Sequence, residues 1–109
     1  MYKVRNVNIG QSQKIYEKLK KFIFRLKKRF VISDIYLFGS FATREIHEGS
    51  DIDLLIVGNF KGRIFDRIKE VMKLTDLPVE PLVYSPEEFK RMKKTSPFLK
   101  NVLKLGIKL

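Results

Sequence analysis

The sequence lacks cysteine and contains a single histidine. Without cysteine, the chain cannot form disulfide scaffolds, thiol nucleophiles, iron–sulfur clusters or cysteine-ligated zinc sites. The histidine, His47, lies in a polar stretch without a paired motif, so we expect a solvated loop side chain there and not the base of a Ser-His-Asp triad. The absence of cysteine and the presence of only one histidine exclude most covalent catalysis and most soft-ligand metal chemistry.

Long hydrophobic runs are also missing. No window approaches the ~20 consecutive apolar residues of a membrane span. The first residues, Met1 to Arg5, lack the apolar run of a signal peptide. We therefore expect a soluble, cytoplasmic protein.

The composition is that of a small, strongly basic domain. Its 109 residues are 44% hydrophobic and include nine Phe and four Tyr, enough to bury one core, so we expect one domain over residues 1–109. Lys and Arg number 23 against 12 Asp and Glu, which gives a formal net charge of +11. This excess predicts attraction to nucleic acids, nucleotides or an acidic protein partner without choosing among them.

Helical and strand-like patterns alternate along the chain. Ser85 and Ser96, each followed by proline, are typical helix N-caps. Apolar spacing by threes and fours, together with these caps, predicts helices over residues 13–30, 62–74, 85–93 and 96–105. β-rich apolar runs predict strands over residues 34–39, 52–58 and 79–84. We therefore predict an α/β (α+β) fold, a small mixed β-sheet with helices packed on one face.

Two strand ends carry the residues with the most specific chemistry. The first predicted strand ends at Gly39-Ser40 and, after ten residues, the second begins with Asp51-Ile52-Asp53. Because strand side chains alternate, Asp51 and Asp53 point to one face while Ile52 points into the core. Two such carboxylates repel unless a cation lies between them, and Mg²⁺ binds carboxylate oxygens together with substrate phosphates. Gly39 allows a phosphate to approach the backbone, and Ser40 offers it a hydroxyl.

A third acid, Glu80, lies early in the third predicted strand. If that strand neighbours the second, Glu80 joins the first two acids, and three carboxylates can hold two metal ions. Each feature also has a plainer interpretation: Gly39-Ser40 as a turn and helix cap, the paired aspartates as protection of a sheet edge, and Glu80 as a solvated strand end. The run Leu54–Val57 argues against an edge, because it is typical of a central strand.

The spacing of Gly39-Ser40 and Asp51-x-Asp53 resembles the signature of the polymerase-beta-like nucleotidyltransferase superfamily. Nearly the whole chain is similar to the smallest branch of that superfamily, the minimal nucleotidyltransferases (MNT). Further matching positions are Ala42, Ser50, Leu54–Val57, Val79–Tyr84 and Pro86–Phe89.

The resemblance implies a reaction: transfer of a nucleoside monophosphate, usually AMP from ATP, to a hydroxyl, with pyrophosphate released and two Mg²⁺ ions as cofactors. By the same resemblance, Gly39 and Ser40 hold the triphosphate, while Asp51 and Asp53 bind both metal ions. Glu80 completes the metal site and favours deprotonation of the acceptor.

This chain departs from the family's pattern at two positions. Arg44 stands where many relatives have glycine, and a contact with the phosphates and exposure to solvent both remain open for its side chain. The third acid is Glu80, where larger relatives have the shorter aspartate, so its reach into the site differs.

The resemblance also implies a partner. Larger nucleotidyltransferases grip the acceptor with a helical domain, for which we expect no room in 109 residues. Prokaryotic MNT proteins resemble the antitoxin of a pair with a helical HEPN protein, an RNA-cutting toxin that is silenced when AMP is attached to a tyrosine. The alternative is a non-catalytic module that inhibits its partner by contact and keeps the acids by descent.

Two basic segments have open interpretations. Residues 14–29 contain eight Lys and Arg against one acid, Glu17. Most charged helix faces are merely solvated, but an excess this one-sided also suits RNA or an acidic partner surface. The cluster at residues 90–94 leaves the same alternatives. A basic RNA-binding domain with incidental acids is disfavoured, because the acids would repel phosphate without a metal.

Overall fold

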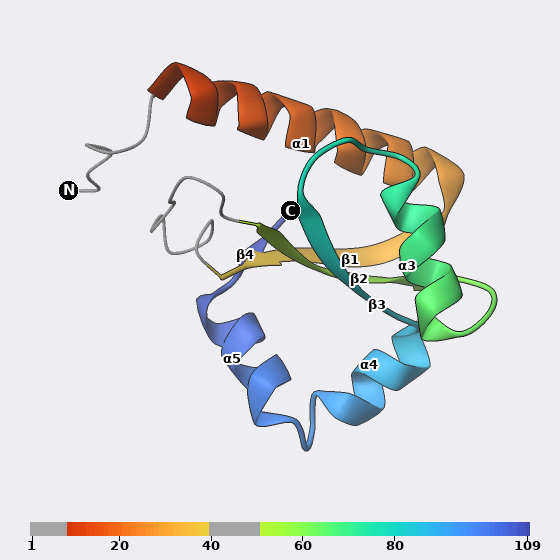
Figure 1. Ribbon diagram of the computed structural model, residues 1–109. Coiled ribbons are helices and arrows are strands. Elements are labelled where there is room, and N and C mark those ends of the chain that lie inside the picture. The colour runs from red at the N-terminus through yellow and green to blue at the C-terminus, as the bar shows by residue number, and fades with distance from the viewer. Residues whose placement is uncertain (1–8, 40–50) are drawn as a thin grey trace.

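The computed structural model describes residues 9–39 and 51–109, and their side chains from Gln13 onward (Figure 1). Helices and strands follow the predicted alternation. They are α1 (Ile9–Arg29), β1 (Val31–Phe38), β2 (Ile52–Asn59), α3 (Ile64–Met72), β3 (Val79–Tyr84), α4 (Pro86–Met92), α5 (Pro97–Leu105) and β4 (Ile107–Lys108). Among the described residues, no helix combines the length and the apolarity that crossing a bilayer requires.

The four strands form one mixed sheet in the order β3-β2-β1-β4. β1 pairs antiparallel with both β2 and β4, whereas β2 and β3 run parallel, joined through α3. This confirms the predicted mixed sheet. Pro81 is tolerated in β3 because β3 is an edge strand, where a missing backbone N–H leaves no ladder bond unmade.

Helices cover both faces of the sheet, so the prediction of helices on one face is wrong. One core joins the buried stripe of α1 and Val71 of α3 to the strands, and the other joins Phe89 of α4 and Leu99 of α5 to the opposite face. In Figure 1, α1 lies on one side of the sheet and α4 and α5 on the other. β2 therefore buries both sets of alternating side chains, as with the neighbours Leu54 and Leu55, each 0% exposed.

The apolar stripe predicted for the first helix is the buried face of α1. Leu19, Phe22 and Leu26 are 3%, 0% and 0% exposed and pack against β1 and β2. Burying three side chains of this size is worth several kcal/mol, at ~1.5–3 kcal/mol each. The charged residues between them are left on the outer face of α1.

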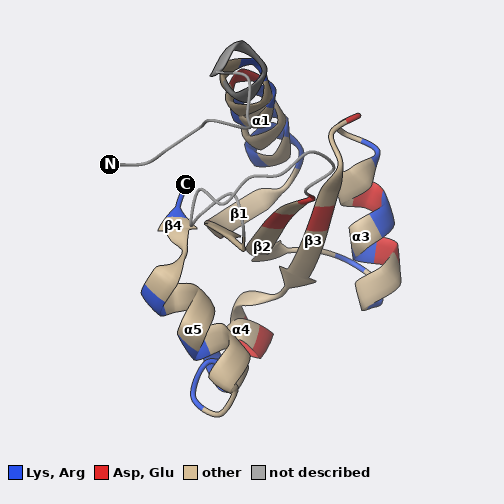
Figure 2. Ribbon diagram, turned by 60° about the vertical axis from the view of Figure 1, so that its left-hand side comes forward, with Lys and Arg blue, Asp and Glu red and all other residues tan. Residues whose placement is uncertain are grey.

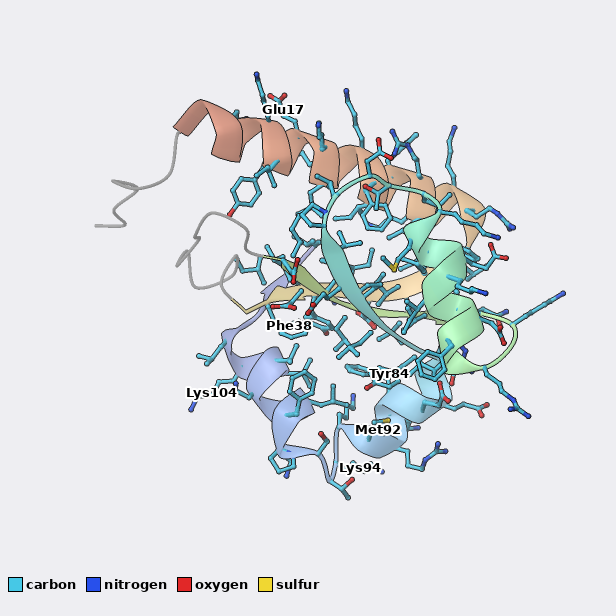
Figure 3. All side chains as sticks on the ribbon, viewed as in Figure 1. Glu17, Phe38, Tyr84, Met92, Lys94 and Lys104 are labelled. Carbon is cyan, nitrogen blue, oxygen red and sulfur yellow. The ribbon has the colours of Figure 1, made fainter. Side chains whose placement is uncertain are left out.

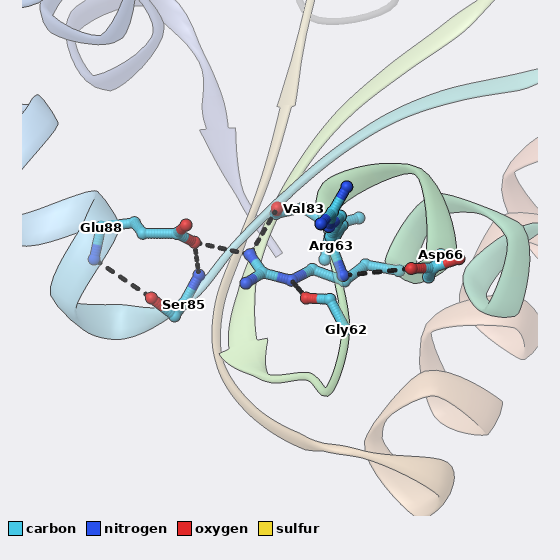
Figure 4. A network of polar contacts seen from close by, with 7 residues as sticks. Gly62, Arg63, Asp66, Val83, Ser85 and Glu88 are labelled. Carbon is cyan, nitrogen blue, oxygen red and sulfur yellow. Dashed lines mark hydrogen bonds and ion pairs between the residues drawn. The ribbon is translucent and has the colours of Figure 1, made fainter.

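A polar network joins α3 to α4 around the end of β3 (Figure 4). The guanidinium of Arg67 in α3 donates to Glu88 of α4 at 2.5 Å and to the carbonyl of Gly62 at 3.0 Å. Glu88 also accepts from the amide of Ser85 at 2.8 Å, and its own amide donates to the Ser85 hydroxyl at 3.2 Å. This reciprocal cap confirms the predicted helix start and ties together the helices of the two faces.

The chain after α5 adds a short strand that the sequence did not predict. Gly106 ends α5, as expected, but in an extended conformation with φ of −76°. A Cβ there would stand 2.5 Å from the carbonyl oxygen of Val102 and 3.0 Å from that of Leu37, so glycine allows a close backbone approach. The chain then pairs with β1, and Lys108 forms an ion pair with Asp34 at 3.2 Å.

Candidate active site

Two of the three candidate acids, Asp53 and Glu80, lie in one row across the sheet. Phe38, the last residue of β1, is in register with Asp53 of β2, and Asp53 is in register with Glu80 of β3. Residues in register on paired strands present their side chains on the same face. Figure 2 shows the row as two red bands side by side on β2 and β3. The structure thus brings Glu80 beside Asp53, as predicted on the condition that the two strands are neighbours.

Gly39 closes the row at the end of β1. Its φ is +72°, a conformation that residues with a Cβ rarely adopt. A Cβ at this position would overlap the Oδ2 atom of Asp53, so the carboxylate rests directly against the glycine backbone. Gly39 was predicted to give a phosphate access to the backbone, and in the structure it also leaves the space in which Asp53 lies.

The three carboxyl groups affect one another's protonation. Asp51 lies exposed just before β2, Asp53 is half-buried and Glu80 is exposed. Hydrogen bonding to Asp51, then the negative charge of Asp51, and lesser contributions of both kinds from Asp53 raise the pKa of Glu80 above its ordinary value. Burial raises the pKa of Asp53, a hydrogen bond with Glu80 acts against this, and the charge of Asp51 adds to the rise. The acids therefore form a cluster of mutually repelling charges.

The cluster has the chemistry of a magnesium site. Carboxylate oxygens are the hard ligands that Mg²⁺ prefers, and a cation among Asp51, Asp53 and Glu80 would relieve their repulsion. Within residues 9–39 and 51–109, no three Asp, Glu, His or Cys side chains are gathered closely enough to form a metal centre as they stand. The donor set fits a cation by its chemistry, although the three carboxyl groups do not form a ready-made centre.

A cavity of about 450 Å³ opens beside the acids. Asp53 and Glu80 are its charged lining residues, and the rest of its wall is apolar. Phe38 and Phe98 contribute to this wall and meet edge to face, with ring centroids 5.5 Å apart. Figure 3 shows Phe38 directed from the sheet toward α5. The carboxylates thus border an apolar space that can admit a side chain.

The predicted site and the site seen in the structure differ in some of their residues. Ser40 and Arg44, predicted to contact the phosphates, lie outside the described residues, as does His47. Phe98 and Met72, which line the cavity, were not predicted from the sequence. Helical spacing indicated where α3 and α5 lie, but no local signal indicates which of their apolar side chains remain exposed.

A known protein family matches most of the chain. The sequence profile of the nucleotidyltransferase domain matches residues 18–108. A relative from Methanocaldococcus jannaschii, provisionally named a protein adenylyltransferase, is 34% identical over 91 residues. The alignment covers 81% of this chain and 90% of the relative.

Solved structures share the fold. A crystal structure from Sulfolobus solfataricus, of a protein provisionally named a nucleotidyltransferase, superposes with a TM-score of 0.62 at 26% identity, covering 76% of this chain and 78% of that one. A chain from the crystal structure of a toxin–antitoxin with AMP-PNP superposes with a TM-score of 0.53 at 19% identity, covering 80% of this chain and 68% of that one. At that identity, the second match speaks for the fold alone.

Proposed function

Because this chain belongs to the nucleotidyltransferase domain family, we propose that it transfers AMP from ATP to a hydroxyl group of a protein partner, with Mg²⁺ as the required cation. The observation that carries the proposal is the row in which Asp53 pairs with Glu80 while its carboxylate rests against Gly39. The apolar cavity beside this row leaves an acceptor room to reach the acids.

In the proposed reaction, the hydroxyl oxygen of the acceptor bonds to the α-phosphorus of ATP. The bond from that phosphorus to the bridging oxygen of the β-phosphate breaks, and pyrophosphate leaves with the electron pair. Mg²⁺, when bound, supplies positive charge that offsets the negative charge on the transferred group. Asp51 and Asp53 hold the cation, and Glu80 completes its site and favours loss of the acceptor's proton. Gly39, with Ser40 and Arg44, holds the triphosphate.

The partner we propose is a helical HEPN-type toxin whose acceptor is a tyrosine, with this chain as its antitoxin. The name of the Methanocaldococcus jannaschii relative supports a protein as acceptor. A chain of a toxin–antitoxin structure has the same fold, so this fold is compatible with a toxin as partner. The cavity beside Asp53 and Glu80 adds a physical reason, since its apolar wall suits an aromatic side chain that ends in a hydroxyl.

The test separates catalysis from inhibition by contact. A candidate HEPN-type partner is incubated with ATP, Mg²⁺ and either the unaltered chain or Asp53→Asn, and its RNA-cutting activity is then measured. We expect the unaltered chain to silence the partner and Asp53→Asn to fail. Asp34→Asn is the matched control, because Asp34 pairs with Lys108 outside the row of acids. Full silencing by Asp53→Asn would instead identify a non-catalytic module that inhibits by contact.

A further inference from the structure

The outer face of α1 presents an aromatic ring among lysines. Phe24 is 60% exposed, although a phenyl ring gains free energy from burial. Lys20, Lys21, Lys27 and Lys28 stand three and four positions to either side, and all four are exposed. On a helix these positions are the nearest neighbours of the central residue. We call these five residues the Phe24 patch.

The Phe24 patch is separate from the buried stripe of the same helix. The core contacts of α1 come from Leu19, Phe22 and Leu26 and from the partly buried Ile15, Tyr16 and Ile23. Phe24 is not part of this packing. The Nζ atom of Lys28 lies 4.9 Å from the centroid of the Phe24 ring. A single exposed apolar side chain is ordinary. What distinguishes Phe24 is that four lysine side chains surround its ring on the helix surface.

The positive charge around the Phe24 patch is complementary to a polyanion. Residues 14–29 carry eight Lys and Arg and one acid, Glu17. In Figure 2, the charged bands along the described part of α1 are mostly blue. Phe24 and the four lysines are all exposed, whereas the neighbouring Arg25 turns toward the fold and donates to the carbonyl of Leu74 at 2.8 Å. A ligand with regularly repeated negative charge would meet the lysines along the helix.

We propose that the Phe24 patch binds single-stranded nucleic acid, with a base stacked on the Phe24 ring and the phosphates on the flanking lysines. Proteins that bind single strands combine a cationic surface with aromatic rings, because every base has a face that can stack. A duplex keeps its base faces covered, and an acidic protein would pair with the lysines but leave the ring without a stacking partner. This binding is independent of the proposed AMP transfer.

The first test measures how binding depends on charge. Fluorescence anisotropy of the full chain is recorded with a labelled RNA strand of about twelve nucleotides, a typical site size, with DNA of the same sequence, and with the duplex. Each phosphate neutralised on a single strand contributes about 0.7 to the slope of log affinity against log salt. Changing Lys20, Lys21, Lys27 and Lys28 to Gln should lower that slope by up to about 3 and abolish tight binding. Equal affinity for single strand and duplex would overturn the proposal, whereas the RNA and DNA arms identify which strand is preferred.

The matched control uses the second basic cluster. Lys90, Arg91, Lys93 and Lys94 are likewise exposed and equal in number, but the aromatic ring beside them, Phe89, is buried. Changing these four to Gln should leave single-strand affinity nearly unchanged. An equal loss from both quadruple variants would mean that net charge alone attracts the strand, and the proposal would fail.

The second test isolates the ring. Phe24→Ala should weaken single-strand binding roughly tenfold, which is what one lost base stack of about 1.4 kcal/mol implies. Phe24→Leu should behave like Phe24→Ala, because it keeps apolar surface without a stacking face, whereas Phe24→Tyr should bind like the unaltered chain. Polyglutamate serves as the comparison ligand. If it binds as tightly as the oligonucleotide, and substitutions at Phe24 change neither affinity, the patch recognises acidic proteins and the proposal is wrong.

Discussion

Gly39 determines where the Asp53 carboxylate can lie. Its positive φ and the overlap that a Cβ would cause with Asp53 Oδ2 are independent reasons for glycine at this position. The first concerns backbone strain and the second concerns the geometry of the site. A second glycine with positive φ, Gly62 (φ +87°), begins the turn before α3, beyond the other end of β2. The two glycines allow strain and site geometry to be separated.

We predict that Gly39→Ala abolishes most transfer activity, whereas Gly62→Ala does not. Both variants should lose about 1–2 kcal/mol of unfolding free energy, because each forces Ala into the left-handed region. Only Gly39→Ala displaces Asp53, and a misplacement of about 1 Å can lower a rate about 100-fold. Urea unfolding and the transfer rate are measured for both variants. Equal transfer rates in the two would show that Gly39 does not set the position of Asp53.

Glu88 contributes to stability in its ionised form. The Ser85 amide, then the Arg67 guanidinium, hold the pKa of Glu88 below its ordinary value of 4.5. Because the folded pKa is the lower one, this contribution is complete well above pH 4.5 and disappears as the pH falls through the folded value.

We therefore predict that Glu88→Gln lowers the unfolding free energy by about 1 kcal/mol at neutral pH, since the carboxylate is only partly buried. The difference from the unaltered chain should vanish in acid, below the folded pKa of Glu88. Urea titrations across the acid range check this. Glu87→Gln, an exposed neighbour in the same turn, is the control and should change stability by less than about 0.5 kcal/mol. A Glu88→Gln effect of the same size at every pH would contradict the electrostatic explanation.

At the scale of elements, α5 contributes to both the core and the cavity through adjacent residues. Leu99 is 0% exposed and belongs to the core under α4 and α5. Phe98 is 47% exposed and lines the cavity beside Asp53. Neighbouring positions on one helix thus have different physical roles.

We predict that Leu99→Ala lowers the unfolding free energy by about 3 kcal/mol, through lost burial and the cavity it leaves. Phe98→Ala should cost only about 1 kcal/mol, mainly the edge-to-face contact with Phe38. Denaturant midpoints of the two variants give the comparison. A larger loss from Phe98→Ala than from Leu99→Ala would mean that the ring is structural and not free to meet an acceptor.

The sequence predicted the elements better than their arrangement. Ser85 and Ser96 signalled two helix starts, and the spacing of Leu19, Phe22 and Leu26 signalled the buried face of α1. The apolar run of β2 indicated a central strand, but helices were predicted on one face only, because which helix covers which face depends on connections that local periodicity does not encode. β4 has two residues and exists only because Leu37 pairs with Ile107, a contact distant in sequence.

The same distinction applies to the candidate site. Asp51 and Asp53 lie two residues apart, so strand alternation was enough to predict that they belong together. Glu80 joined them only if β3 paired with β2 in parallel, which is the usual outcome of a strand–helix–strand connection. The cavity wall required tertiary structure, because Phe98 reaches the site from a helix of the opposite end of the chain.

At the scale of the whole molecule, net charge and local charge oppose each other. The chain carries +11 overall, which attracts a nucleoside triphosphate from a distance. At the proposed site, the carboxylates of Asp51, Asp53 and Glu80 would present negative charge to the same phosphates. The net charge acts over a long range and the carboxylates act at contact distance, so the carboxylates determine how tightly the triphosphate binds at the site.

We predict that ATP binds at least tenfold more weakly without a divalent cation. Calorimetry with Mg²⁺ and with a chelator measures the two affinities. Asp53→Asn should reduce the difference between the ATP affinities in Mg²⁺ and in chelator, because it removes one of the negative charges that the cation offsets. Equal affinities for the unaltered chain in Mg²⁺ and in chelator would show that the carboxylates do not face the nucleotide.

The most direct test of AMP transfer is the position of the label that reaches the partner. The unaltered chain and Asp53→Asn are each incubated with Mg²⁺, the HEPN-type partner and ATP labelled at either the α- or the γ-phosphate. We predict that α-label appears on a partner tyrosine, that γ-label is released as pyrophosphate, and that Asp53→Asn lowers α-label transfer by orders of magnitude while remaining folded. Label from the γ-phosphate on the partner, or α-label transfer undiminished in Asp53→Asn, would contradict nucleotidyl transfer at this row of acids.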